Sequence, residues 1–461
     1  MKPTIGNTKL AIAWVVAAMG TTALQAVTLD DCITAALRNN PDLRAATERV
    51  QAARAALQQA RSAYYPTLGS SVTYARTDNP PQAFMMMLNQ RSVSMQSDFN
   101  NPPDTDNLAL GLGLKYPLFD FGRRSLDTAM AREGSEIQQL VLQGLQNELV
   151  HQVARGYFSV LQASAYVAVQ EESVQTLEES LRVANERFKA GSAVKTDVLN
   201  LDVQLAQANE DLIRARNGVR LTLAALNTAI GANLAGSSNM PAVVELPATP
   251  PPEHEDPAVL QDRPELQAAR KGATVQRNAL QKARKQYWPT VNAYGSLDWN
   301  SAVSSDFERS YLVGVMAEVD LFDGFRRQSV TTGAKAQARA AEAEVAKAAN
   351  NLALDLTAAS IQAGEAWERL EVARKSIANA EEALRITRER YQQGAANLPE
   401  LLTAQVGLTG TRTRNVAARY DYLTALSNLQ RARGELVRRY TKDEQASGKV
   451  GRDADPTLKA P

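Results

Sequence analysis

The segment LALGLGLKYPLFD at residues 108–120 decides the fold, and YLVGVMAEVDLFD at residues 311–323 repeats its pattern. In both segments large apolar side chains alternate with small or polar ones. An alternation with a period of two is typical of a β-strand that presents one apolar face. Each alternating stretch is about ten residues long, which is the length of a tilted strand that crosses a bilayer. We therefore predict lipid-facing strands at about 108–118 and 311–321.

Each of these strands has an expected partner earlier in its half of the chain, at about 67–75 and about 290–299. A hairpin of a soluble β-sandwich would also carry one apolar face. The opposite face here carries Gly, Ser, Lys and Asp rather than a second apolar surface, and the two pairs are far apart in the sequence. Both observations favour strands that lie in lipid.

The whole chain is an internal repeat. Asn40–Leu43 returns as Arg263–Leu266, and Tyr65–Thr67 returns as Trp288–Thr290, both 223 residues later. All later matches, beginning with the two Leu-Phe-Asp motifs, are 203 residues apart. The difference predicts a loop in the first half, between residues 74 and 108, that is longer than its counterpart. This loop contains three consecutive methionines, for which a flexible apolar contact is favoured over a soft-metal site.

Two proline-free segments, 123–190 and 327–392, predict helices of unusual length. Their apolar residues recur at spacings of three and four, as on one face of a helix. At 1.5 Å per residue, a helix of roughly 70 residues is on the order of 100 Å long. Helices of this length must pack along one another in the manner of coiled coils, because no globular core is so long.

Glycine-containing breaks turn each long helix back on itself and produce helical hairpins at 123–230 and 327–438. In the first hairpin, Thr196 or Asp197 is suited to cap the returning helix. In the second hairpin, Pro399 suits the first turn. Each hairpin therefore ends in a tip far from the strands.

The remaining segments define the expected domain organisation. Residues 1–26 have the basic start, short apolar run and small residues of a cleavable signal peptide, and the run is too short for a transmembrane anchor. A Pro-rich linker or peripheral segment at 232–263 separates the repeats at 27–231 and 264–441. The polar tail at 442–461 is expected to be disordered.

Composition excludes several classes of protein. The chain has 461 residues with 51 Lys and Arg against 50 Asp and Glu, so no excess of charge indicates a nucleic-acid partner. It has two histidines, His151 and His254, and one cysteine, Cys32, which excludes a disulfide framework within one chain and a Cys/His zinc site. We expect no catalytic residue, no cofactor and no metal, and we place Cys32 at an apolar position of the first helix.

Four membrane strands require more than one chain. An open sheet edge in lipid leaves unpaired backbone groups, and membrane barrels have at least eight strands. Two chains give eight strands around a filled interior, whereas three give twelve strands with a lumen. Continuity with the long helices favours the wider barrel, although this argument alone excludes only the monomer.

In this arrangement the chain resembles the TolC-like outer-membrane efflux protein family. The resemblance is carried by the NPDL and RPEL helix starts, the two aromatic-Pro strand entries, the paired Leu-Phe-Asp turns and the tip glycines. It implies an α+β membrane protein, namely a homotrimer with a 12-stranded transmembrane β-barrel, four strands per chain, that continues into a long periplasmic α-helical barrel. It further implies a passive outer-membrane duct for efflux or type I secretion, which contacts outer-membrane lipid and receives drugs, metal ions or proteins from an inner-membrane pump through a periplasmic adaptor.

The resemblance also implies a gate at the periplasmic tips. Asp197, six residues after Gly191, and Glu400, six residues after Gly394, match the acidic residues of the family gate. Tyr391 matches the family tyrosine that bonds the acid of the first hairpin. A ring of three Glu400 carboxylates would attract cations. The simpler alternatives are an N-cap for Asp197 and a solvated helix acid for Glu400.

Two positions depart from the family pattern at the tips. Thr403 stands where the family has a second ring acid, and Ala396 stands where it has a basic residue. The closing network is therefore thinner here or is built from other residues. The main alternative function is a secreted soluble coiled-coil scaffold or adaptor without pore activity, and an enzyme is third.

Overall fold

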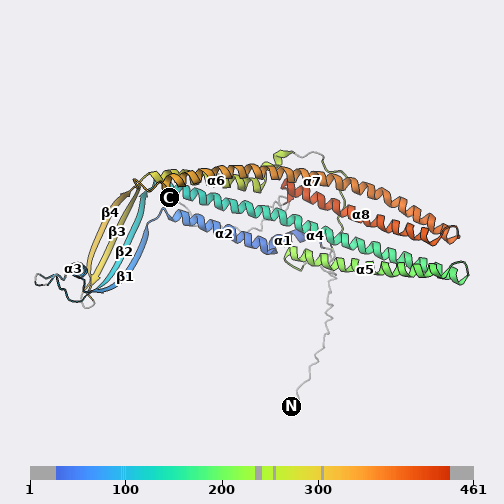
Figure 1. Cartoon of the computed structure of the whole chain (residues 1–461), viewed down its shortest axis with the longest axis horizontal. Helices are drawn as coiled ribbons and strands as arrows, with labels where there is room; N and C mark the ends of the chain where they lie inside the picture. The colour runs from blue at the N-terminus through green and yellow to red at the C-terminus, as the bar shows by residue number, and fades with distance from the viewer. Residues whose placement is uncertain are drawn as a thin grey trace, which may run out of the picture.

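The computed structural model describes residues 27–94, 96, 98, 100–233, 241–252, 256–302 and 306–436. The chain is elongated, with a small sheet at one end and two helical hairpins that reach the other end (Figure 1). The expected signal peptide and tail, and also His254, lie outside the described residues. Within the described part of the chain, no helix is both long and apolar enough to cross a membrane.

The sheet has four antiparallel strands in the order β1-β2-β3-β4, and they are β1 (Thr67–Thr77), β2 (Thr105–Phe119), β3 (Thr290–Ser301) and β4 (Glu308–Glu318). The two strand pairs expected from the sequence are not separate, because β2 pairs with β3 and joins the two repeats in one sheet. Strands β1 and β4 form its two edges.

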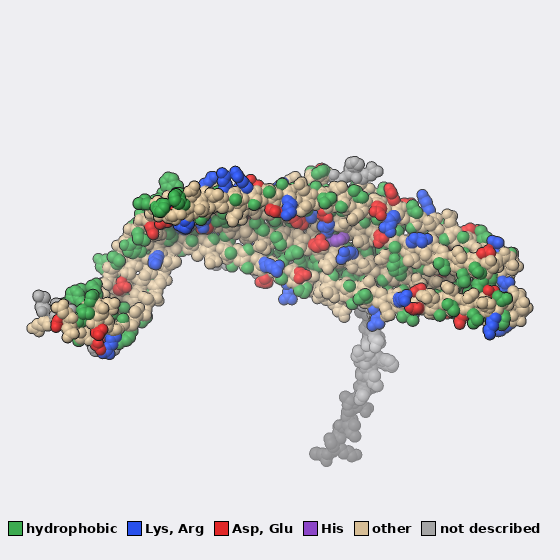
Figure 2. Space-filling view, viewed as in Figure 1, with side chains coloured by type: hydrophobic (Ala, Val, Ile, Leu, Met, Phe, Trp, Pro, Cys, Tyr) green, Lys and Arg blue, Asp and Glu red, His purple; other side chains and the backbone are tan. Residues whose placement is uncertain are grey.

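In the observed register, one face of the sheet is apolar and the opposite face carries small and polar side chains. Val72, Leu110 and Trp299 lie in one cross-strand row, and Ser71, Gly111 and Asp298 lie in the next row on the opposite face. On the apolar face, Val72 is 71% exposed. Figure 2 shows hydrophobic side chains on the surface of the sheet and at the bend where it meets the helices. Such a face suits a lipid environment.

The helices repeat the duplication of the sequence. The four helices of the hairpins are α4 (Arg123–Lys189), α5 (Lys195–Ile230), α7 (Arg326–Gln392) and α8 (Leu398–Arg433). Both α4 and α7 have 67 residues, and both α5 and α8 have 36. The shorter elements are α1 (Leu29–Asn39), α2 (Pro41–Ser62), α6 (Pro264–Arg284) and the 3-10 helices η1 (Pro257–Asp262) and η2 (Lys285–Tyr287).

The helices pack side by side in an open row. Near the sheet the order is α2-α4-α6-α7, which matches the order of the strands that they precede or follow. Towards the tips the order becomes α5-α4-α8-α7, because α5 and α8 replace α2 and α6 beside the two long helices. One chain is therefore an arc with free edges along its whole length.

The largest buried cluster lies midway along the helices, where α1 packs against α4 and α5. Tyr157 is fully buried there, and its hydroxyl donates to the carbonyls of Val27 (3.0 Å) and Ala242 (2.8 Å). Cys32 lies on α1 at a fully buried position, as predicted, and burial raises the pKa of its thiol to about 12. The thiol is therefore unreactive at neutral pH.

The longer connection predicted for the first half lies between β1 and β2, and its methionines Met85–Met87 lie in a helix, α3 (Pro80–Asn89), which begins with two prolines. Two local predictions differ from the structure. The N-cap of α5 is Val194, so the prediction that Thr196 or Asp197 caps this helix was wrong. The helix begins earlier because Val194 is already extended directly after the tip turn. Helix α8 ends at Arg433, five residues before the expected end of its hairpin.

Candidate functional site at the hairpin tips

Each hairpin turns at a glycine in the left-handed region. Gly191 and Gly394 both have φ of +76°. The amide of Gly191 donates to the carbonyl of Phe188 (3.0 Å), and the amide of Ser192 donates to the carbonyl of Arg187 (2.9 Å). This pair of bonds is the Schellman motif that ends many helices, and it also closes α7. The two predicted tip glycines thus fix two turns of the same geometry.

Arg187 joins the two hairpins directly above these turns. Tyr391, on α7, is 4% exposed and lies in the apolar cluster between the tips. The Arg187 guanidinium, on α4, donates to the Tyr391 carbonyl at 2.7 Å and lies 4.9 Å from the centroid of its ring. Arg187 was missed from the sequence. The signal that could have found it is its place one residue before Phe188, the repeat equivalent of Tyr391.

The expected bond between Tyr391 and Asp197 is absent from the described chain. The Tyr391 hydroxyl is buried and has no hydrogen-bond partner among the described residues. Burial raises the pKa of Tyr391, while Arg187 opposes the rise and the nearby Asp197 carboxylate reinforces it. Asp197 lies in the first turn of α5, and its carboxylate forms no ion pair or hydrogen bond with a described residue. Two complementary groups therefore lie near each other without being joined.

Glu400 lies in the first turn of α8, where its amide donates to the side chain of the N-cap residue Asn397 (3.0 Å). Its side chain is 46% exposed, and one of its carboxylate oxygens is 3.8 Å from a nitrogen of Arg390. Arg390 also donates to the carbonyl of Ala395 (3.2 Å). A basic side chain thus accompanies this acid even though Ala396 lacks one, and Arg390 is a second tip residue that was missed from the sequence.

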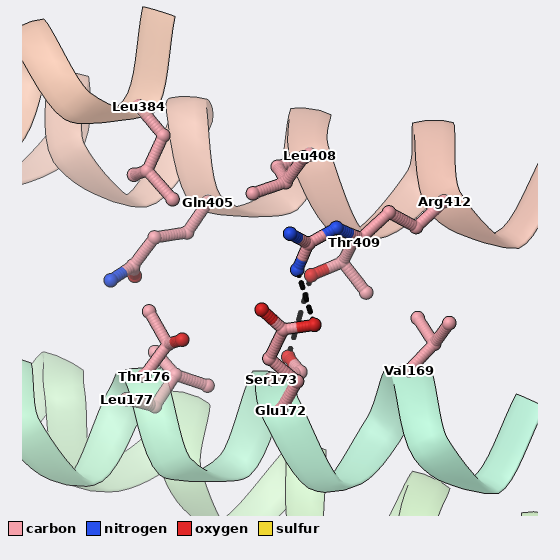
Figure 3. A pocket seen from close by; sticks show the side chains of 10 residues that line it. All are labelled: Val169, Glu172, Ser173, Thr176, Leu177, Leu384, Gln405, Leu408, Thr409 and Arg412. Carbon is pink, nitrogen blue, oxygen red and sulfur yellow. Dashed lines mark hydrogen bonds and ion pairs between the residues drawn. The ribbon is translucent and has the colours of Figure 1, made fainter. Parts of the chain in front are cut away.

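A row of polar side chains lies between α4 and α8 on the side of the tips that faces the sheet. We call it the polar seam, and its cross-helix pairs are Glu172 with Arg412, Ser173 with Thr409, and Ser180 with Gln405. Figure 3 shows Arg412 of α8 directed at Glu172 of α4, with 2.5 Å between the paired atoms. Arg412 also pairs with Glu381 of α7 at 2.8 Å. Beside it the hydroxyl of Thr409 donates to that of Ser173 at 3.5 Å. Charged and hydroxyl groups therefore hold the two hairpins in register along this seam.

Gln405 continues the seam towards the tips. It is 6% exposed, its amide nitrogen donates to the Ser180 hydroxyl at 2.8 Å, and its amide oxygen has no partner among the described residues. A cavity of about 20 Å³ lies beside it (Figure 3). That volume holds one water molecule, which would satisfy the amide oxygen.

Ion pairs also fix the joints where strands meet long helices. Asp120 accepts from the backbone amide of Arg124 (2.8 Å) and pairs with its side chain at 3.1 Å. The Arg124 guanidinium in turn lies 5.1 Å from the ring centroid of Tyr64. Asp323 and Arg327 repeat this pairing at 2.9 Å in the second half. The duplicated joints set the angle between sheet and hairpins, which Figure 1 shows as a bend.

Of the two histidines, the structure describes His151, which lies near the middle of α4. His151 is buried in α4, and its Nδ1 lies 3.0 Å from the hydroxyl of Ser427. Among the described residues, no three His, Cys, Asp or Glu side chains are grouped so that they could hold a metal ion.

Comparison with known proteins agrees with this architecture. The outer membrane efflux protein family matches residues 32–232 and 257–435. The protein CyaE of Bordetella pertussis is 26% identical over 90% of this chain and 85% of its own length. The outer membrane protein TolC of Vibrio cholerae is 23% identical over 96% of this chain and 99% of its own length.

Solved structures share the fold. The CmeC outer membrane channel of Campylobacter jejuni superposes with a TM-score of 0.79, with 16% identity, over 96% of this chain and 98% of that channel. The MtrE outer membrane channel of Neisseria gonorrhoeae gives 0.73 over 88% and 89% with 20% identity. The chain therefore belongs to the outer membrane efflux protein family, and it is an outer-membrane channel protein with a long periplasmic extension.

Proposed function

We propose that three copies of the chain close into one homotrimeric duct. The observation that carries this proposal is that the sheet and the row of helices are both open. The edge strands β1 and β4 are followed along the molecule by α2 and α7, which form the edges of the helix row near the sheet. Three four-stranded sheets give a barrel of 12 strands, which is wide enough for a lumen. The helix rows of the three chains would continue this lumen through the periplasm.

The duct conducts passively and catalyses nothing. It receives its substrate from an inner-membrane pump through a periplasmic adaptor, and it serves either efflux or type I secretion. Relatives of both kinds support this breadth, since their names include the alkaline protease secretion protein AprF of Pseudomonas aeruginosa and the cation efflux system protein CusC of Escherichia coli.

The same proposal assigns roles along the chain. Residues 1–26 are a signal peptide, residues 27–231 and 264–441 are the two structural repeats, and residues 232–263 link them. In each repeat the strands serve the membrane and the hairpin serves the periplasmic entrance.

We further propose that the tips form the gate. Gly191 and Gly394 shape the turns, Tyr391 and Asp197 form the closing bond, and three Glu400 side chains form a cation-attracting ring. The support for the bond is that the Tyr391 hydroxyl and the Asp197 carboxylate lack partners among the described residues while Asp197 acts on the Tyr391 pKa. A small shift of the tips on assembly would join the two groups.

The duct is tested by its assembly and its conductance. Protein purified from membranes in detergent is expected to sediment as a trimer and to form discrete channels in a planar bilayer. A soluble monomer without channel activity would instead support the secreted coiled-coil scaffold.

The gate is tested separately with Asp197→Ala and Tyr391→Phe, each of which is expected to raise the single-channel conductance several-fold. Tyr166→Phe, on α4 away from the tips, is the matched control, and unchanged conductance in both tip variants would refute the proposed bond.

A further inference from the structure

An aromatic and basic corner lies where the sheet meets the helices. Phe119 ends β2, Phe121 lies in the turn after it, and Arg123 begins α4. Lys285 begins η2 and Trp288 follows it, between α6 and β3. The rings of Phe121 and Trp288 stack with centroids 5.0 Å apart, and Phe119 meets Phe121 edge-on at 4.6 Å. Arg123 reaches the carbonyl of Trp288 at 3.5 Å. We name these five residues the membrane corner.

The aromatic residues of the membrane corner continue the apolar face of the sheet. A register shift after Pro117 places Phe119 opposite Val291, on the face that also carries Leu110 and Trp299. Phe119 is 53% exposed and Trp288 is 56% exposed. Aromatic side chains at the end of a lipid-facing strand lie at the level of the lipid headgroups.

The two cations of the membrane corner have no acidic partner. Arg123 and Lys285 are half-buried, and neither forms an ion pair with any residue in the described ranges. The nearby carboxylates are committed elsewhere, since Asp120 pairs with Arg124 and Asp127 pairs with Lys282. The Lys285 amine lies close to the start of α4, because a Cβ added at Gly122 would be 3.0 Å from its nitrogen. Two half-buried cations of one corner that lack an acidic partner among the described residues favour an external anion.

The corresponding joint between β4 and α7 differs in the pairing of its basic residue. Phe322 and Phe325 pack edge-on at 5.5 Å, and Arg326 is the repeat equivalent of Arg123. Arg326, however, lies 3.6 Å from Asp320 and 3.7 Å from Asp323, so its charge is compensated within the chain. The first-repeat counterpart of Asp320 is Pro117, which carries no charge. Among the described residues, only the joint between β2 and α4, to which the connection between α6 and β3 also contributes, therefore presents an uncompensated aromatic and basic corner.

We infer that the membrane corner binds the headgroup of an anionic glycerophospholipid from the periplasmic leaflet. Arg123 and Lys285 contact the phosphate, while Phe119 and Trp288 pack against the glycerol and the start of the acyl chains. An anionic lipid is preferred because a zwitterionic headgroup brings its own cation towards the two basic side chains. The inference rests on the proposed function, since it requires the sheet to lie in the membrane, and it gives three such sites per trimer.

Native mass spectrometry of the trimer tests the inference. The trimer is released from mixed micelles with equal amounts of phosphatidylglycerol and phosphatidylethanolamine. We expect up to three bound phosphatidylglycerol molecules per trimer and a preference for this lipid over phosphatidylethanolamine. The preference should fall about tenfold or more in Arg123→Gln/Lys285→Gln, because each basic residue near a membrane surface contributes about fivefold in affinity. The matched control is Arg220→Gln/Lys375→Gln, which removes two exposed cations far from the sheet and should leave the preference unchanged.

The possible outcomes separate this inference from the channel itself. Equal binding of the two lipids by the unmodified trimer, or a preference that survives in Arg123→Gln/Lys285→Gln, would overturn the inference. A preference lost equally in the control would also overturn it, because the effect would then be one of net charge. The same samples are recorded in a neutral bilayer. Conductance without lipid preference refutes the corner alone, whereas absence of both trimer and conductance refutes the proposed duct.

Discussion

At the residue scale, Arg187 is the side chain that most directly connects the two tips. Its bond to the Tyr391 carbonyl is charge-assisted, and its guanidinium covers the Tyr391 ring. A charged hydrogen bond contributes about 1.5–3 kcal/mol and a cation–π contact about 0.5–2 kcal/mol. We predict that Arg187→Gln loosens the closed tip and raises single-channel conductance several-fold in a planar bilayer. Arg390→Gln is the comparison, since Arg390 bonds only within its own hairpin among the described residues. An equal or larger effect of Arg390→Gln would contradict the bridging role of Arg187.

Glu400 allows a prediction about ion selectivity. Its carboxylate is half-exposed and lies 3.8 Å from Arg390, so this one cation compensates it only loosely in the proposed ring of three copies. Carboxylate rings favour cations in a pore. We predict that Glu400→Gln lowers the ratio of potassium to chloride permeability, measured as the reversal potential in a salt gradient. Asp202→Asn, which removes an exposed acid from α5, is the control, and an unchanged reversal potential in Glu400→Gln would exclude the ring.

His151 gives the helical region a predictable response to acid. Burial, together with the positive charges of Arg431 and Arg155, lowers its pKa from 6.5 to about 4, while Asp355 acts in the opposite direction. The unfolded chain therefore binds a proton more tightly than the folded chain. The contribution of His151 to stability is complete above pH 6.5 and is lost as the pH falls towards 4.

The fall of the His151 pKa from 6.5 to about 4 corresponds to about 3 kcal/mol of stability per chain at 1.36 kcal/mol per pKa unit. We predict that the thermal unfolding midpoint of the protein falls between pH 6.5 and pH 4, and that His151→Gln flattens the fall while retaining a partner for Ser427. A variant that is as acid-sensitive as the parent protein would show that other groups control this response.

At the element scale, the sequence predicted the strands, helices and turns that depend on local patterns of residues. The alternation in residues 108–118 and the breaks at Gly191 and Gly394 correspond to observed strands and turns. The pairing of β2 with β3 was missed, because strand partners distant in sequence are chosen by the assembled sheet and not by local pattern. The bridging role of Arg187 was missed for the same reason, since its partner Tyr391 is 204 residues away.

Two helix-ending glycines differ in their surroundings and allow a comparison between elements. Gly191 has φ of +76° and open space around it, whereas Gly231, with φ of +74°, lies where an added Cβ would approach the backbone oxygen of Asn39 to 2.9 Å. A left-handed alanine costs about 1–2 kcal/mol in either place. We predict that Gly191→Ala destabilises by about this amount and that Gly231→Ala costs clearly more, because α1 must move away from α5. Denaturant midpoints of the two variants measure the difference, and equal shifts would show that the backbone contact is readily relieved.

At the scale of the whole molecule, the arc leaves α5 and α7 with exposed apolar side chains along its two edges. On α5 these include Val203, Ile213 and Leu221, each at least 60% exposed. On α7 they include Ile361 and Val372, each 66% exposed. Large apolar side chains in a stripe along a helix indicate a packing partner. In the proposed trimer, that partner is the opposite edge of the next copy.

The positions of two of these residues permit a test by charge exchange. Ile213 is 22 residues after Gly191, and Val372 is 22 residues before Gly394, so the two lie at the same height above the tips. Burial of such a side chain contributes about 1.5–3 kcal/mol, and three interfaces multiply the effect. We predict that Ile213→Glu or Val372→Lys alone lowers the trimer fraction in sedimentation experiments in detergent, and that the double variant recovers it through ion pairs between copies. Val243→Glu, at a position 71% exposed outside the helix row, is the control and should leave the trimer intact. Failure of the double variant to recover would mean that α5 and α7 of neighbouring copies do not meet at this height, and that the arcs close in another register.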